Sequence, residues 1–156
     1  MNIKKAPWVW VAGGVASVAS VLVWANRRMF VVNDVTAGRT EMYPEIKPHA
    51  YAYPASQVFA VAEATAREMP RWRVTSVDRL GREAAVEAQL PLFGFVDDVT
   101  IRVDPIEGSK VCEVIVRSRS RTGSGDLGEN ARRIVAFYRA LDERIRNSGV
   151  PAEPAT

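Results

Sequence analysis

The 156-residue sequence has only one cysteine, Cys112, and only one histidine, His49. A single cysteine cannot form an internal disulfide, so a domain outside the cytoplasm would depend on its core alone for stability. Cys112 lies inside an alternating segment, and we expect it to be buried and inert. His49 lies in a proline-rich stretch with no serine, cysteine or aspartate arrangement around it, so we interpret it as an exposed loop histidine. The sequence predicts no cofactor and no metal site.

The chain also lacks an excess of basic residues in its main part, although its net charge is +3 and its pI is about 9.3. Four basic residues, Lys4, Lys5, Arg27 and Arg28, flank one apolar segment. Removing these four from the 21 lysines and arginines leaves 17, against 18 aspartates and glutamates, all of which follow residue 28. We therefore exclude a nucleic-acid partner and assign the basicity to contact with lipid headgroups.

The apolar segment Ala6–Asn26 contains no charged residue. Its length is close to the roughly 20 residues that a helix needs to cross the hydrocarbon core of a bilayer. Tryptophans favour the membrane interfaces, and long basic side chains can reach lipid phosphates. The sequence predicts one transmembrane helix from Trp8 to Trp24 within a membrane anchor of residues 1–28. The residues expected to contact lipid are Trp8, Trp10, Trp24, Lys4, Lys5, Arg27 and Arg28.

A short tail before the anchor and a long domain after it favour an N-terminus in the cytoplasm and a domain outside it. In a Gram-negative bacterium that location is the periplasm. A cleaved signal peptide is the alternative, because Ser17–Ala19 and Val23–Ala25 both offer small residues at cleavage positions. Cleavage after the first would fall within the apolar run, and cleavage after the second would require an unusually long run. We therefore favour an anchor that is retained.

The segment 29–53 has no sustained periodicity and contains Gly38, Pro44 and Pro48, so we expect an extended arm. Apolar residues at helical spacing then predict a helix between Pro54 and Pro70. Alternating residues predict four strands, at 71–78, 83–90, 98–104 and 110–121. A stripe with spacings of three and four predicts a second amphipathic helix, which follows Asp126 and ends before Gly149 and Pro151.

These elements predict an α+β domain over residues 54–148, with the order α-β-β-β-β-α after the N-terminal transmembrane helix. A four-stranded antiparallel sheet with both helices packed on one face would bury all of the apolar surfaces together. The residues after the last helix, 149–156, are expected to form a disordered tail.

Two segments carry a family resemblance. Leu92–Val103 reads LFGFVDDVTIRV, and Arg117–Arg121 reads RSRSR and is followed by GDLGENARRI at Gly125–Ile134. Together they resemble the bacterial and plastid family known as domain of unknown function 1499, over about residues 33–141. Members often carry an N-terminal hydrophobic segment. The resemblance implies the extent of the domain, and it implies no reaction, substrate or catalytic residue.

The strongest candidate for a binding surface is a row of three arginines, Arg117, Arg119 and Arg121. Alternate residues of a strand share one face, so their side chains would project about 7 Å apart. Such a row can grip phosphates, carboxylates or anionic headgroups. The alternative is a solvated sheet face whose arginines pair with Asp98 and other acids on neighbouring strands. Phe93 and Phe95 could form a hydrophobic lip beside this site, or plug the end of the sheet.

Adjacent carboxylates at Asp97 and Asp98 suggest a second site, for a divalent cation or for acid–base chemistry. Neighbours on a strand point to opposite faces, however, so the two cannot easily converge on one ion. We expect instead that one aspartate pairs with a strand arginine and that the other caps a turn.

We therefore predict a non-enzymatic, single-pass, membrane-anchored accessory or binding domain at the cell envelope. Its expected partners are membrane lipid, through the anchor, and an anionic amphiphile or an envelope protein at Arg117, Arg119, Arg121, Asp98, Phe93 and Phe95. The alternatives are a hydrolase or metal-dependent enzyme with a polar site around Asp97 and Asp98, and a purely structural envelope protein.

Overall fold

The computed structural model of the protein describes residues 31–91, 94–123 and 125–148. The predicted anchor at 1–28 and the predicted tail at 149–156 lie outside these ranges. Within the described residues, no helix combines the length and the apolar character needed to cross a bilayer.

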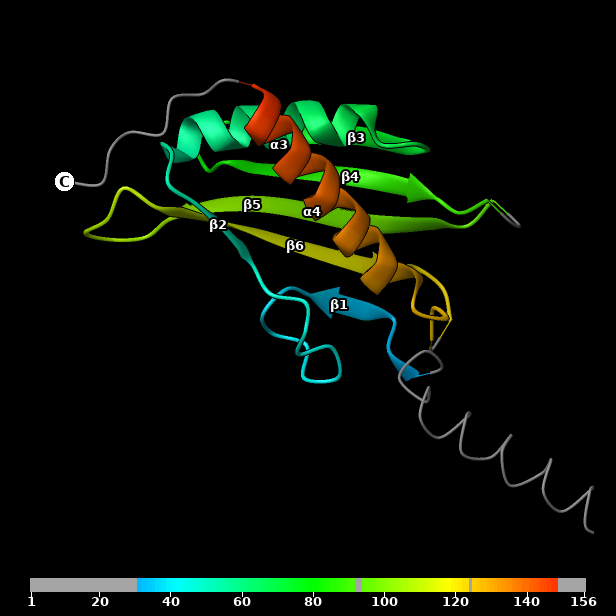
Figure 1. Ribbon diagram of the computed structural model, residues 1–156. Helices are drawn as coiled ribbons and strands as arrows, with labels where there is room; N and C mark the ends of the chain where they lie inside the picture. The colour runs from blue at the N-terminus through cyan, green and yellow to red at the C-terminus, as the bar shows by residue number, and fades with distance from the viewer. Residues whose placement is uncertain (1–30, 92–93, 124, 149–156) are drawn as a thin grey trace, which may run out of the picture.

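The described part of the chain is an α+β domain with six strands and two helices (Figure 1). The elements in chain order are β1 (Asp34–Thr36), β2 (His49–Tyr51), α3 (Ala55–Glu68), β3 (Trp72–Asp78), β4 (Glu83–Gln89), β5 (Val96–Pro105), β6 (Cys112–Ser120) and α4 (Glu129–Asn147). All strand pairs are antiparallel, and the order across the sheet is β1-β6-β5-β4-β3. β2 pairs with β6 as well, beside Cys112–Val114, whereas β1 pairs beside Arg117–Arg119.

The predicted four-stranded sheet and its element order are therefore wrong. The segment that we expected to be an extended arm contributes β1 and β2, which cover one edge of β6. Each has three residues, which is too short for an alternating pattern to identify. The same segment supplies core residues, because Val35, Tyr43 and Ile46 are buried.

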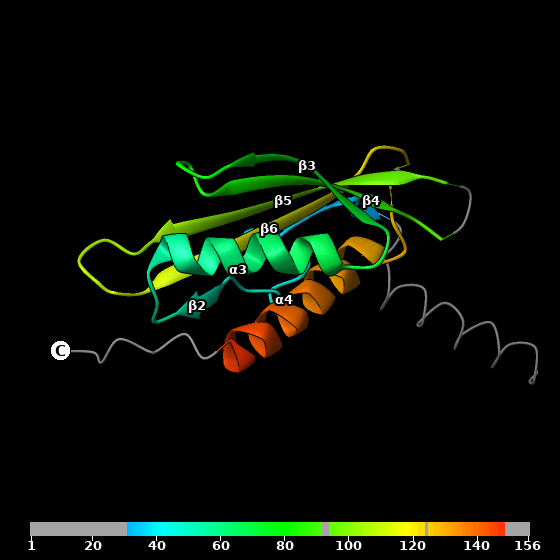
Figure 2. The same ribbon diagram turned by 90° about the horizontal axis from the view of Figure 1, so that it is seen from above.

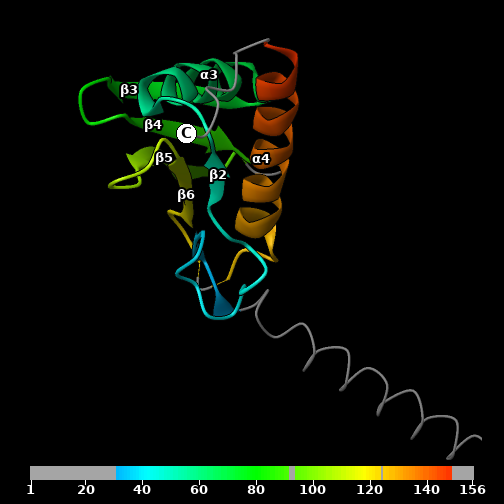
Figure 3. The same cartoon turned by 60° about the vertical axis from the view of Figure 1, so that its left-hand side comes forward.

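Both helices lie on the same side of the sheet, and α4 crosses it obliquely (Figures 2 and 3). α3 packs on β3, β4 and β5, and α4 packs on β6 and β1. The space between α4 and the sheet is filled by side chains of α4 that are fully buried, including Ile134, Phe137 and Leu141. Phe137 stacks on Trp72 of β3, with 5.6 Å between the ring centroids. The opposite face of the sheet carries mostly polar side chains.

Candidate functional site

Arg117 and Arg119 of β6, and Arg121 directly after it, lie on the face of the sheet without helices. Arg117 donates two hydrogen bonds to Asp34 on β1, with Nε–Oδ1 and Nη2–Oδ2 distances of 2.9 and 2.5 Å. This hydrogen bonding lowers the pKa of the Asp34 carboxyl. Arg119 is exposed, and no carboxylate among the described residues lies within ion-pairing distance of it. The charge of Arg117, at one end of the row, is thus compensated by an acid on a neighbouring strand.

The other outer charge is compensated as well. Arg121 donates to Asp98 on β5 at 2.6 Å and to Glu87 on β4 at 2.8 Å, both from Nη2. The hydrogen bonds from Arg121 lower the pKa of Asp98 and of Glu87. Cross-strand pairing of this kind is the alternative that the sequence left open for the arginine row. It leaves Arg119 as the cation of the row that is available to an anion.

Asp97 and Asp98 point to opposite faces of β5. Asp98 lies on the outer face, and Asp97 is 2% exposed beneath α4. The two carboxylates therefore do not converge, and no cluster of three or more metal-ligating side chains occurs in the described ranges. The expectation that one aspartate pairs with a strand arginine holds for Asp98. The expectation that the other caps a turn is wrong, because Asp97 pairs with Arg133 of α4.

The predicted hydrophobic lip consists of Phe93 and Phe95. Phe95, the residue immediately before β5, is 48% exposed. Phe93 lies outside the described residues. The hydrophobic lip remains a prediction.

A buried polar cluster lies between the first turn of α4 and the ends of β5 and β6. Its members are Asp97, Ser118, Ser120, Asn130 and Arg133, each less than 10% exposed. The Arg133 Nη1 donates to Ser118 Oγ and to Asn130 Oδ1, both at 2.8 Å. The Ser118 hydroxyl also donates to Asn130 Oδ1, at 2.6 Å. Asn130 Nδ2 donates to Ser120 Oγ at 3.0 Å.

An ion pair completes the cluster. Arg133 Nη2 lies 2.8 Å from Asp97 Oδ2, although the geometry does not give that oxygen a well-aligned hydrogen bond. Burial raises the pKa of the Asp97 carboxyl, while Arg133 and Ser120 oppose this effect and Asp126 adds to it. Taking both charges out of water is costly, so a buried pair of this kind is weak support for a purely stabilising role.

The cluster also holds the segment that leads into β1. Asn130 Nδ2 donates to the backbone carbonyl of Asn33 at 3.0 Å, and Ser120 N donates to the same carbonyl at 2.8 Å. Asn33 Nδ2 in turn donates to the Gly123 carbonyl at 2.7 Å. The Asp126 carboxylate accepts hydrogen bonds from the backbone N–H groups of Gly128 and Asn130 and so caps α4.

A groove of about 240 Å³ opens beside this cluster, between the α3–β3 turn, the end of β4 and the first half of α4. We call it the arginine groove, because its lining includes Arg71, Arg132 and Arg133. Arg132 is paired with Glu129 at 2.8 Å. Arg71 is exposed, and no ion pair to it is formed within the described residues. Apolar parts of the wall come from Met69, Pro70, Trp72, Ala88, Pro91 and Ala136.

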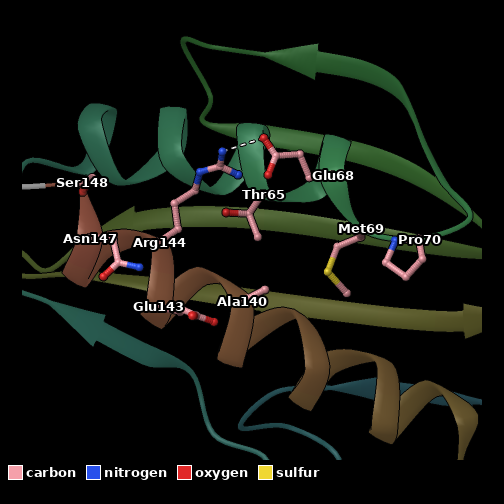
Figure 4. Close-up of a pocket in the computed structure, with 9 residues that line it drawn as sticks. All are labelled: Thr65, Glu68, Met69, Pro70, Ala140, Glu143, Arg144, Asn147 and Ser148. Carbon is pink, nitrogen blue, oxygen red and sulfur yellow. Dashed lines mark hydrogen bonds and ion pairs between the residues drawn. The ribbon is translucent and has the colours of Figure 1, made fainter.

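A larger groove of about 660 Å³ runs between α3 and the second half of α4 (Figure 4). Arg144 of α4 bridges it to Glu68 of α3, with an Nη2–Oε1 distance of 2.6 Å, and this hydrogen bond lowers the pKa of Glu68. Met69 and Pro70 line both this groove and the arginine groove, so the two adjoin at the C-terminal end of α3.

His49 is part of a side-chain network and does not lie in a loop. It belongs to β2, and its ring stacks on Tyr138 of α4 with 3.9 Å between the centroids. Its Nδ1 lies 3.3 Å from Asp142 Oδ1, and the Tyr51 hydroxyl donates to the same oxygen at 2.6 Å. Burial and the hydrogen bond to Asp142 raise the pKa of Tyr51. The interpretation of His49 as an exposed loop histidine was wrong, because it lies in β2 and packs on α4; its partner Asp142 is 93 positions away in the sequence, so no local pattern could show the contact.

Sequence reasoning also missed Arg133 as a member of a buried site. A signal was present, because Asn130, Arg133, Phe137 and Leu141 are spaced by three, four and four and share one helix face. All four are buried. A polar pair that continues a buried stripe indicates a buried polar contact rather than a solvated face.

The fold is an α+β domain in which two helices cover one face of an antiparallel sheet. The chain belongs to the family described as "Protein of unknown function (DUF1499)", whose model matches residues 17–141. This confirms the family resemblance. Both segments that carried it, around Asp97 and around Ser118 to Arg133, meet in the buried polar cluster. No curated protein matches the sequence.

Similar solved structures include two aromatase/cyclases. The di-domain aromatase/cyclase BexL from the BE-7585A biosynthetic pathway is 13% identical with a TM-score of 0.50, over 77% of this chain and 48% of that chain. This chain thus spans about half the length of BexL. The Zhui aromatase/cyclase from Streptomyces sp. R1128 is 12% identical with a TM-score of 0.46, over 75% of this chain and 96% of that chain. At these identities the similarity concerns the fold alone.

Proposed function

We propose that this protein is a non-enzymatic binding domain that holds an anionic amphiphile close to a membrane. The observation that carries the proposal is the arginine groove, in which Arg71, Arg132 and Arg133 lie beside an apolar wall. A site for an amphiphile needs both features, because arginine binds the charged headgroup and burial of the apolar tail is favourable. The groove between the two helices adjoins the arginine groove at Met69 and Pro70, so it offers further length for the tail of an amphiphile.

Arg71 is the cation of this groove most available to a ligand. It is exposed, whereas Arg132 is paired with Glu129 and Arg133 with Asp97. Its backbone has a φ of 62°, a left-handed conformation that costs a non-glycine residue about 1 kcal/mol or more. The Arg71 carbonyl accepts a hydrogen bond from Gln89 N at 2.9 Å, which holds the turn at the groove.

The position of the groove supports the link to a membrane. The described chain leads into β1 at Asn33, whose carbonyl is bonded to Asn130, and Arg133 lies one helical turn further along α4. A membrane anchor at residues 1–28 would therefore hold the arginine groove at the end of the domain nearest the bilayer. We further propose that the N-terminus is cytoplasmic and the domain extracytoplasmic. A reporter that is active only outside the cytoplasm, fused after Thr156, should be active, and silence would reject this orientation.

The binding proposal can be tested with the full chain in nanodiscs of neutral lipid. Binding of a dansylated fatty acid is measured by its fluorescence for the wild type and for Arg71→Gln. A charge-assisted hydrogen bond contributes about 1.5–3 kcal/mol, so the variant should bind at least about tenfold more weakly.

Arg119→Gln is the matched control, because it removes one exposed arginine, without an ion pair to any described residue, from the other face of the sheet. It should bind like the wild type. If Arg119→Gln weakens binding and Arg71→Gln does not, the outer arginine row is the site. If the wild type binds no amphiphile, the proposed function is wrong.

A further inference from the structure

Both terminal nitrogens of Arg133 already have partners where the residue lines the arginine groove. Its Nη1 donates to Ser118 and Asn130, and its Nη2 lies 2.8 Å from Asp97. These contacts fix the guanidinium against the sheet. An anion that reaches Arg133 from the groove must therefore share it with the carboxylate of Asp97.

Sharing one buried guanidinium between two anions is electrostatically unfavourable. Asp97 is 2% exposed, so water cannot screen a second negative charge beside it. Two carboxylates that share a site do not both stay ionised, and one of them takes up a proton. Since burial already raises the pKa of Asp97, this carboxyl is the group with the smaller cost of protonation.

The surroundings of Asp97 strengthen this expectation. From α4 the facing charge is Arg133, and from the segment before α4 it is Asp126, whose negative charge adds to the effect. From β6 the neighbour is Ser120, which is neutral, and the residue opposite on β4 is Ala88. Among the described neighbours of Asp97, Arg133 is thus the cation that favours its ionised form, and a ligand that shares the charge of Arg133 weakens that effect.

We propose that the arginine groove binds its anionic ligand together with one proton, which Asp97 takes from solvent. The ligand class that suits such a site is a monoanionic amphiphile whose headgroup contacts Arg133. This inference rests on the proposed function. It adds that affinity rises as pH falls, by up to about tenfold for each pH unit while the free protein holds Asp97 ionised.

The test uses a medium-chain alkyl sulfonate below its micelle concentration. A sulfonate keeps its charge over the working range, so any proton taken up on binding goes to the protein. The full chain in neutral nanodiscs is titrated calorimetrically at about pH 7, in two buffers of different ionisation enthalpy. The difference in measured heat gives the number of protons bound, which should approach one.

Two variants locate the proton. Asp97→Asn should still bind the sulfonate, with no proton uptake and with an affinity that does not depend on pH. Asp98→Asn is the matched control, because it removes the adjacent carboxylate on the outer face, and it should keep the uptake. Binding by the wild type without proton uptake would overturn the inference and leave the proposed function standing. Uptake that persists in Asp97→Asn would overturn it too, and a wild type that binds no sulfonate would overturn both.

Discussion

Replacing Arg133 with methionine is the most informative perturbation of the buried polar cluster. The substitution removes the ion pair to Asp97 and the hydrogen bonds to Ser118 and Asn130, while a similar apolar stem remains. It leaves the Asp97 carboxylate buried without its cation. Removing one partner of a buried pair costs about 3–5 kcal/mol of unfolding free energy. We expect a loss in this range near neutral pH.

The pH dependence of that loss provides a second check. Burial raises the folded-state pKa of Asp97 above the unfolded value of about 3.9, and removing Arg133 removes the main influence that opposes this shift. A group with a raised folded pKa stabilises the protein below its unfolded pKa and loses that contribution as pH rises through the folded pKa. The penalty of Arg133→Met should therefore be smaller at about pH 5 than at about pH 8.

The measurement is chemical denaturation of the full chain in neutral detergent micelles, followed by near-UV circular dichroism. The double variant Asp97→Leu/Arg133→Met is the control, because it removes both charges. Replacing a whole buried pair by apolar residues is often close to neutral, so this variant should recover most of the loss. If the unfolding free energy of Arg133→Met lies within about 1 kcal/mol of the wild-type value at both pH values, Asp97 and Arg133 do not form the buried ion pair described above.

Three further predictions concern the rest of the fold. Asp142→Leu removes the acceptor of the Tyr51 hydroxyl and should lower the unfolding free energy by about 1–3 kcal/mol, measured by denaturation at neutral pH. Gly38→Ala should cost about 1–2 kcal/mol in the same assay, because Gly38 has a φ of 73° and an added Cβ would lie 2.8 Å from Pro48 Cδ. Arg119→Gln should change stability by less than about 0.5 kcal/mol, since Arg119 forms no ion pair with the described residues; a larger loss would show that it has a structural partner.

The local pattern of apolar and polar residues predicted the longer strands and helices well. The four strands predicted from alternation correspond to β3, β4, β5 and β6, and the two predicted helices correspond to α3 and α4. Alternation and helical spacing are signals within one element, so no distant contact is needed to read them. The number of strands was wrong because β1 and β2 owe their conformation to pairing with β6. A three-residue strand has no periodicity of its own.

The candidate site shows the same difference between what local pattern predicts and what depends on distant contacts. Sequence reasoning placed Asp97 and Asp98 on opposite faces, with Asp98 on the face away from the helices, because Asp98 alternates with the apolar residues Val99, Ile101 and Val103. The structure confirms this arrangement, and it shows that Asp97 pairs with Arg133 of α4, a partner that the strand pattern cannot reveal. The pairing of Arg117 with Asp34 depends likewise on β1, which the sequence did not reveal.

The sequence by itself determined the longer helices and strands, the family and the near-neutral charge of the domain, because these follow from residue order and composition. Only the tertiary structure decided that Asp97, Asn130 and Arg133 form one buried network beside a groove, and that the outer arginine row is largely neutralised. The physical reason is that both outcomes depend on groups brought together across the sheet. Their charges, burial and hydrogen bonds exist only once those distant segments are packed against one another.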